Sequence, residues 1–244
     1  MKLREIQVLV PAPDCQIQAT MITPVQQGPW PGMLLYTDIF QRTESTLRTA
    51  RRLAAAGFVV CVPEIYPRGA LAGVALEFDD AGKQSGLAGA AATTTAQFDS
   101  DRAAVLDFLE QRAEIDGLVA VGFCIGGHIA LRAAFDPRIA ATICCYPTGL
   151  HNGALGADRD AATLAGTHLI RGRLMIVFGS SDPHVPAEAR VQIISALYAA
   201  GLDDLELHVY QGGEHAFMRD VGARHDPVLT DLVISEALSF LAAR

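Results

Sequence analysis

Short apolar runs alternate with amphipathic stretches along most of the chain, and this alternation predicts an α/β protein. Apolar runs bounded by Gly, Pro or Asp are typical of buried strands, and apolar residues three or four positions apart are typical of helices. The predicted strands are MLLYTD, FVVCVP, LVAVGF, AATICCY, RLMIVF and LELHVY. Because predicted helices separate them, these strands should pair in parallel through right-handed crossovers.

Three predicted helices have a clear core-facing side. Their inward residues are Leu47, Ala50, Leu53 and Ala54, then Phe98, Val105, Leu106 and Leu109, and finally Val233, Ala237, Phe240 and Leu241. Residues 4–10 and 16–23 predict an antiparallel hairpin at a sheet edge. Two long segments, 67–96 and 147–172, interrupt the pattern, and we expect functional loops there, the second in a position suited to a lid or a substrate contact.

The composition fits a globular protein and matters mainly for what it excludes. Half of the 244 residues are hydrophobic, which is enough for the core of a single domain over residues 1–244. A net charge of −8 opposes nonspecific binding to nucleic acid or anionic lipid, and no run approaches the roughly 18 apolar residues of a membrane span. The five cysteines lack C-x-x-C and zinc spacing, and no signal-peptide pattern is present. We expect a cytoplasmic protein without a bound metal.

The strongest chemical signal is VGFCIGGH at residues 121–128, between a predicted strand and a predicted helix. Gly122, Cys124 and Gly126 form G-x-C-x-G, the spacing of the nucleophile elbow in the α/β-hydrolase fold, with cysteine in place of serine. The glycines make room for backbone in a strained turn. The elbow also places the sulfur at a helix N-terminus, where the helix dipole favours a thiolate. We therefore predict that Cys124 is a nucleophile.

Two further polar residues follow later strands in the order that this fold uses. Asp182 lies in GSSDPHVP and His215 lies in GGEHAF, so the chain order is nucleophile, acid, histidine. His215 would accept the thiol proton, Asp182 would orient the imidazole, and Cys124 would attack an acyl carbon. The backbone amides of Ile125 and Ile39 would form the oxyanion hole. The predicted reaction is acyl transfer to water.

The segments VGFCIGGH, GSSDPHVP, GGEHAFMR, PEIYPR and TDIF together resemble the dienelactone hydrolase (carboxymethylenebutenolidase) family, over about residues 5–243. The resemblance implies an eight-stranded, mostly parallel α/β-hydrolase fold with helices on both faces, no large cap domain, a Cys-Asp-His triad and no cofactor. It implies that Asp38, in place of a family glutamate, contacts and modulates the thiol. It also implies that Arg219 holds a substrate carboxylate, and Lys83 is the cation that the segment 67–96 offers in place of a second family arginine.

Plainer interpretations compete with these assignments. Cys124 could be a core thiol, Asp182 could cap the following helix, and six other histidines compete with His215. The charged loop residues could be solvated. Tyr66 ends a strand on the predicted active face, where it would line the substrate pocket or pack in the core.

We predict a hydrolase of small lactones or carboxylic esters, acting through an acyl-enzyme intermediate. Two other functions stay open. A protein of the same fold could bind small acids without turnover, because fold does not fix function. An activated sulfur could also serve as a thiol redox sensor, although no resolving cysteine is identifiable. The sequence leaves the oligomeric state and the physiological substrate open.

Overall fold

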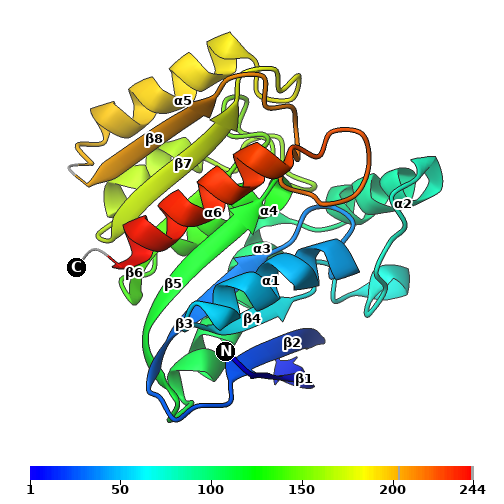
Figure 1. Ribbon diagram of the computed structural model, residues 1–244. Helices are drawn as coiled ribbons and strands as arrows, with labels where there is room; N and C mark the ends of the chain where they lie inside the picture. Colours follow the sequence, from blue (N-terminus) through cyan, green and yellow to red (C-terminus); the bar gives the residue numbers. More distant parts are fainter. Residues whose placement is uncertain (203, 243–244) are drawn as a thin grey trace.

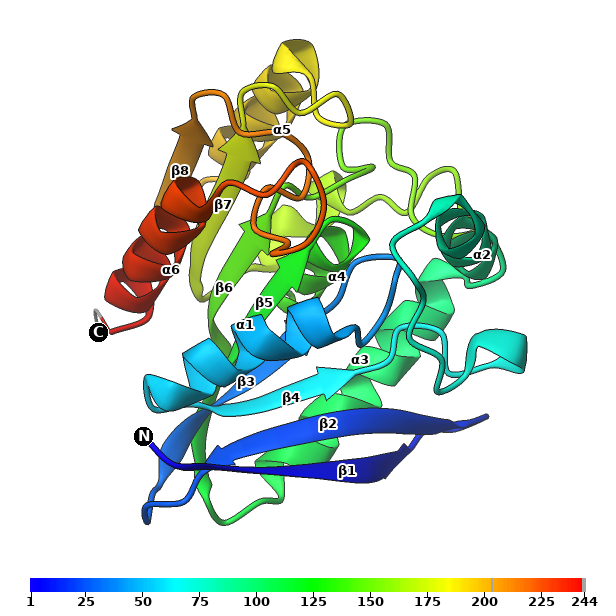
Figure 2. The same cartoon turned by 45° about the vertical axis from the view of Figure 1, so that its right-hand side comes forward.

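The computed structural model describes residues 1–202 and 204–242, in which eight strands form one sheet in the order β1-β2-β4-β3-β5-β6-β7-β8 (Figure 1). The strands are β1 (Leu3–Pro11), β2 (Gln16–Pro24), β3 (Trp30–Tyr36), β4 (Val59–Pro63), β5 (Ile115–Phe123), β6 (Ile139–Cys145), β7 (Arg173–Gly179) and β8 (Leu205–Tyr210). β2 pairs antiparallel with β1 and with β4, and the other neighbouring strands pair in parallel. The predicted mostly parallel sheet is confirmed. Figure 2 shows the predicted hairpin at the edge opposite β8.

Helices cover both faces of the sheet, and each face has its own apolar core. The helices are α1 (Glu44–Ala55), α2 (Asp80–Ala91), α3 (Thr95–Glu110), α4 (Ile125–Ala133), α5 (Ala187–Ala199) and α6 (Pro227–Ala242), with 3₁₀ turns η1 (Gly69–Leu71) and η2 (Leu164–Leu169). α1 and α6 lie in front of the sheet in Figure 1 and bury residues such as Leu53 and Phe240. α3, α4 and α5 cover the other face with residues such as Leu106, Ile129 and Ile193. The core-facing sides predicted for α1, α3 and α6 are confirmed.

The segment 67–96 is not the irregular loop that its sequence predicts, because it contains α2. The carboxylate of Asp79 caps this helix by accepting a hydrogen bond from Gly82 N at 2.7 Å. On the buried side of α2, a Cβ on Gly86 would lie 2.5 Å from the carbonyl oxygen of Ile39. α2 therefore packs by close backbone approach rather than through large apolar side chains, and hydrophobic periodicity could not reveal it.

The parallel strands bring several loops to one edge of the sheet. The segments after β3, β5, β6, β7 and β8 all leave the carboxyl ends of their strands there, where ligands bind in open α/β sheets. α2 stands beyond this edge, at the right of Figure 1, and the second predicted insertion, residues 147–172, contains η2. The candidate residues from distant parts of the chain can therefore meet.

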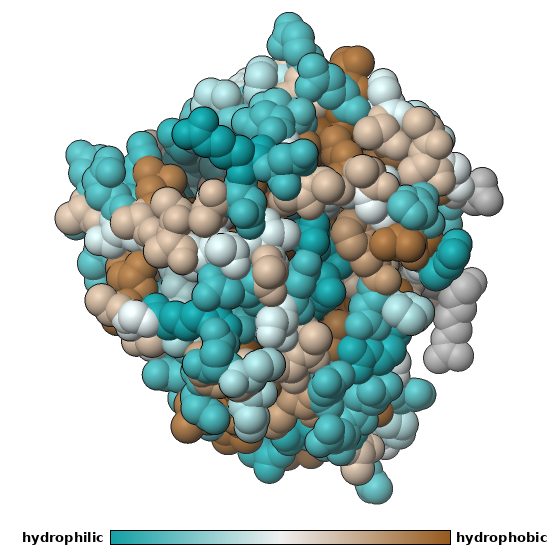
Figure 3. All heavy atoms as spheres, turned by 180° about the vertical axis from the view of Figure 1, so that it is seen from behind, coloured by the Kyte–Doolittle hydropathy of each residue, from teal (hydrophilic) through white to brown (hydrophobic). Residues whose placement is uncertain are grey.

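The surface is mixed in character. On the side opposite that of Figure 1, hydrophilic side chains are interleaved with apolar ones (Figure 3). Within residues 1–202 and 204–242, no helix is long and apolar enough to cross a membrane. The five cysteines are all free, and Cys144 and Cys145 pack into opposite cores of the sheet, as neighbouring residues of a strand must.

Candidate active site

Cys124 occupies a sharp turn between β5 and α4, with φ of 59° and ψ of −122°. A positive φ is costly for a residue with a Cβ, so surrounding contacts must hold it. The amide of Cys124 donates a hydrogen bond to Cys145 O at 3.0 Å. A Cβ on Gly122 would lie 2.0 Å from Gly126 O, and a Cβ on Gly126 would lie 2.2 Å from Thr37 O. The two glycines thus allow β5, α4 and the loop after β3 to meet at the sulfur.

Asp182 and His215 lie side by side in the loops after β7 and β8. Nδ1 of His215 is 2.8 Å from Oδ2 of Asp182, and both side chains are buried. The second carboxylate oxygen, Oδ1, accepts a hydrogen bond from the backbone amide of His184 at 2.7 Å. Because the carboxylate accepts the Nδ1 proton, Nε2 is the ring nitrogen left for proton transfer.

The charges of these groups support one another. Burial opposes a positive charge on His215, but the negative charge of Cys124 and the hydrogen bond to Asp182 raise the pKa of His215 to about 10. Burial also works against the carboxylate of Asp182, yet the hydrogen bond and the charge of His215 lower its pKa. The arrangement favours an imidazolium at His215 beside a carboxylate at Asp182.

The two amides predicted to bind an oxyanion lie at the junction that Gly126 creates. Ile39 is in the loop after β3, which α4 contacts at Thr37 O. Among the described residues, the amide of Ile39 donates no hydrogen bond to a backbone carbonyl in the loops and turns. Ile125 is the first residue of α4, and its amide has no acceptor within the helix. Both amides can therefore donate to a ligand.

The sequence predicts separate roles for Asp38, at the thiol, and Arg219, at the substrate. In the structure these two side chains lie next to each other. Oδ1 of Asp38 accepts a hydrogen bond from Phe40 N at 2.9 Å, and Oδ2 lies 3.6 Å from Nη1 of Arg219. Burial raises the pKa of Asp38, against the effects of the Phe40 amide and Arg219. Among the described residues, neither a hydrogen bond nor an ion pair joins Asp38 to Cys124. The modulation of the thiol by Asp38 stays a prediction.

The guanidinium of Arg219 is held between two aromatic rings. Its central carbon lies 5.2 Å from the ring centre of Phe40 and 4.6 Å from that of Phe78, distances at which a cation attracts a π face. Its Nε is buried without a hydrogen-bond partner among the described residues. Arg219 is thus a fixed cation whose donors are only partly used.

Two other predicted contact residues lie around this region. The Tyr66 hydroxyl is buried without a hydrogen-bond partner in the described part of the chain, and burial together with the negative charges of Cys124 and Asp38 raises its pKa. The Tyr66 hydroxyl therefore lies within electrostatic reach of Cys124 and Asp38. Lys83 is exposed on α2 and has its charge near His184, whose pKa is lowered by burial, by His215 and, to a smaller extent, by Lys83.

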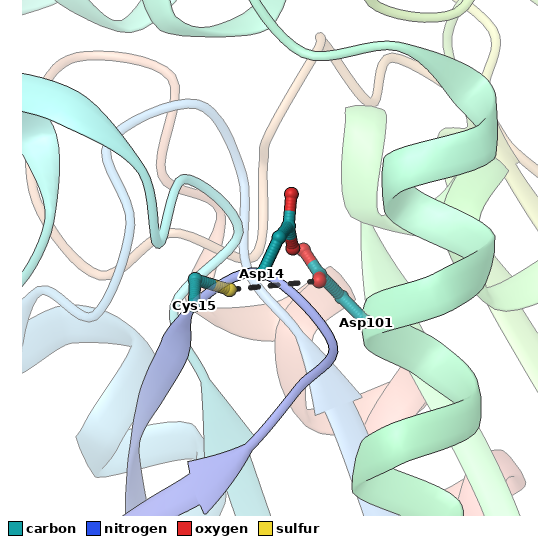
Figure 4. A group of neighbouring side chains, drawn as sticks. All are labelled: Asp14, Cys15 and Asp101. Atoms are coloured by element: carbon teal, nitrogen blue, oxygen red, sulfur yellow. Dashed lines mark hydrogen bonds between the residues drawn. The ribbon is translucent and has the colours of Figure 1, made fainter.

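A second cysteine–carboxylate group lies away from the elbow, where the β1–β2 turn meets α3. Figure 4 shows Asp14, Cys15 and Asp101 with their ligand-type atoms turned toward one another. Arg68 fills this group, because it donates to Asp14 Oδ2 at 2.9 Å and to Asp101 Oδ2 at 2.7 Å. Burial and the Asp101 charge raise the pKa of Cys15 to about 11. We interpret the group as an internal ion pair with an unreactive thiol.

Sequence reasoning missed three residues that the structure brings to the candidate site. Phe78 contacts Arg219, the ring centre of His184 lies 4.5 Å from that of His215, and the Thr148 hydroxyl lies 3.9 Å from the Cys124 sulfur. Thr148 follows β6 at its carboxyl end, and this position could have indicated it. Phe78 carried no such signal.

The strand order, the turn after β5 and the loops that carry Asp182 and His215 define an α/β-hydrolase fold. The predicted fold class is confirmed. The model of the dienelactone hydrolase family matches residues 17–243, and the chain belongs to that family.

Named relatives agree with this assignment. A "Putative carboxymethylenebutenolidase" of Saccharomyces cerevisiae is 31% identical over 199 residues, covering 80% of this chain and 72% of the relative. A protein of the same name from Synechocystis sp. is 27% identical over 221 residues, and the aligned region covers 90% of this chain and 88% of the relative. The crystal structure of a "Putative Dienelactone Hydrolase" from Klebsiella pneumoniae superposes over 100% of both chains with a TM-score of 0.87 and 21% identity, which shows the shared fold.

Proposed function

We propose that this protein hydrolyses small lactones or carboxylic esters, with Cys124 as nucleophile, His215 as base and acid, and Asp182 as the residue that orients the imidazole. The observation that carries the proposal is the buried 2.8 Å contact between His215 and Asp182, next to a cysteine at a positive-φ elbow. Membership of a hydrolase family supports it.

The proposed reaction has two halves. The thiolate of Cys124 attacks the acyl carbon, and the amides of Ile125 and Ile39 donate to the oxyanion. The leaving alkoxide departs with the proton from Nε2 of His215, which leaves a thioester on the sulfur. Water then attacks the thioester while Nε2 takes its proton, the carboxylic acid leaves, and the sulfur regains its starting state.

The surroundings of Arg219 favour a substrate that carries its own carboxylate. The aromatic rings of Phe40 and Phe78 fix the guanidinium, and Asp38 lies 3.6 Å away, beyond a close hydrogen bond. A carboxylate presented at this point would take up unused donors and the unpartnered Nε. We include among the proposed substrate contacts Arg219 and the Tyr66 hydroxyl, which has no hydrogen-bond partner within the described residues, and the exposed Lys83.

The test is turnover of p-nitrophenyl acetate and a panel of small lactones by the parent protein and by Cys124→Ala. The parent should hydrolyse at least one substrate, and the variant should lose that activity by several orders of magnitude. Cys15→Ala is the matched control, because the raised pKa of Cys15 makes it an unreactive thiol, and it should retain activity. Equal rates for the parent and Cys124→Ala would refute the mechanism.

Mass spectrometry separates the proposal from its two alternatives. A hydrolase should accumulate an acyl adduct on Cys124 when a slow ester is used, and iodoacetamide should block both adduct and turnover. Saturable binding of small acids with no turnover of the panel would favour a binding protein. A reversible disulfide after peroxide treatment would favour a redox sensor.

A further inference from the structure

The side chain of Thr148 faces the sulfur of the elbow from the side of the second insertion. Its Oγ1 lies 3.9 Å from Sγ of Cys124, within reach of a hydrogen bond to a large sulfur atom. Among the described residues, this hydroxyl has no other hydrogen-bond partner. We propose that Thr148 is a further catalytic residue, whose hydroxyl donates a hydrogen bond to the thiolate of Cys124. The inference rests on Cys124 being the nucleophile of the proposed function.

Both peptide groups of Thr148 are tied to α4. Its amide donates to Cys124 O at 3.2 Å, and its carbonyl oxygen accepts a hydrogen bond from Nδ1 of His128 at 2.9 Å. These bonds hold the backbone of Thr148 beside the first turn of the helix. The hydroxyl is therefore positioned by contacts on either side of it rather than by a flexible loop.

The direction of each hydrogen bond in this support can be deduced. A carbonyl only accepts, so Nδ1 of His128 carries the proton, and burial lowers the pKa of His128 to about 4, which keeps the ring neutral. Nε2 must then accept from the Thr163 hydroxyl at 2.7 Å, and that oxygen accepts from Nη1 of Arg132 at 3.1 Å. These hydrogen bonds link Arg132, Thr163, His128 and Thr148 in that order, and each donor in the link has an acceptor.

The chemistry of the sulfur decides what Thr148 can do there. Once the thiol proton has moved to His215, the sulfur has a negative charge and no hydrogen, so Thr148 can act only as donor. The hydroxyl keeps its proton throughout. A hydrogen bond to the charged form stabilises it relative to the neutral form. Thr148 would therefore increase the fraction of thiolate, in addition to the effect of His215.

The test is the pH dependence of Cys124 alkylation by iodoacetamide, measured by peptide mapping. Thr148→Val keeps the shape of the side chain and removes the hydroxyl. Its alkylation midpoint should move up by about 0.5–1 pH unit, which is about a threefold to tenfold slower reaction below the midpoint. Thr148→Ser should restore the parent profile. His215, Tyr66 and Tyr146, the titratable groups whose charges interact with the sulfur, are unchanged in these variants.

Thr167→Val is the matched control, since the Thr167 hydroxyl lies in the same insertion but donates to Leu164 O at 2.7 Å. It should leave the alkylation midpoint unchanged even if it lowers the melting temperature. If Thr148→Val does not fold, Thr148→Ala removes the same hydroxyl without a second methyl group. A midpoint equal to that of the parent in either folded variant, or a shifted midpoint in Thr148→Ser, would overturn the inference.

Alkylation needs no substrate, so the two proposals can fail separately. A parent protein that is alkylated at Cys124, with the midpoint shifted in Thr148→Val, but hydrolyses nothing would sink the proposed function and leave the hydrogen bond intact. Turnover that depends on Cys124, together with an alkylation midpoint that does not shift in Thr148→Val, would support the proposed function and refute the hydrogen bond from Thr148.

Discussion

The buried imidazole of His128 should make the stability of this protein fall as the pH is lowered from 7 to 5. Burial lowers the pKa of His128 from 6.5 to about 4, because its effect exceeds that of the hydrogen bond to Thr148, which acts in the opposite direction. The charge of Arg132 also lowers this pKa, and the charge of Asp99 raises it. Between these two values the unfolded chain binds a proton that the folded chain excludes. The stabilising effect is therefore complete above pH 6.5 and is lost progressively down to the folded pKa.

The size of the effect follows from the two pKa values. A shift from 6.5 to about 4 corresponds to roughly 3 kcal/mol in total, of which about 2 kcal/mol is lost between pH 7 and pH 5. Other groups also titrate in this range, so the comparison must be with a variant. His128→Gln keeps an amide donor and acceptor near Thr148 and Thr163 but cannot titrate.

The assay is urea unfolding of the parent and His128→Gln at pH 7, 6 and 5. The free energy of unfolding of the parent should fall by about 2 kcal/mol more than that of the variant over this range. Both proteins share every other titratable group, so that difference isolates the imidazole. Parallel pH dependences, within about 0.5 kcal/mol, would show that His128 is not held neutral and would refute the reasoning.

Four changes at the site have expected outcomes. Gly126→Ala should lower kcat on the order of 100-fold with little change in KM, because the new Cβ separates the two oxyanion amides; stopped-flow ester hydrolysis measures it. Asp182→Asn should lower kcat/KM at least about 100-fold at neutral pH in the same assay. Phe78→Leu should raise KM about threefold for an acidic ester but not for its neutral analogue, since the contact with Arg219 is lost. Binding of a small carboxylate to Arg219 should be accompanied by proton uptake at Asp38, whose pKa is already raised by burial, and calorimetry in two buffers should show that Asp38→Asn abolishes it.

The sheet and the elbow could be predicted because each leaves a local mark in the sequence. Buried parallel strands are apolar runs, and a turn with a positive φ at Cys124 needs glycines at fixed spacing. α2 could not be predicted, because its buried side consists of small residues that approach neighbouring backbone. The hydrophobic pattern carries no information about such contacts.

The candidate site divides in the same way. Cys124, Asp182 and His215 follow strands whose carboxyl ends meet at one edge, so chain order and the strand pattern were enough to select them. The partners of Asp38 and Arg219 could not be inferred, because they depend on how Phe40 and Phe78 from separate loops meet around one guanidinium. Contacts of this kind are set by tertiary packing and have no spacing rule.

The second insertion has contacts to the nucleophile elbow in addition to the lid or substrate contact that its sequence predicts. Residues 147–172 form hydrogen bonds to α4 through His128, which accepts from Thr163 and donates to Thr148. In the proposed mechanism, the charge at the sulfur is then supported from two independently fixed sides, by His215 from the loop after β8 and by Thr148 from the segment after β6. A change within the insertion can therefore alter the reactivity of the thiol without touching the triad.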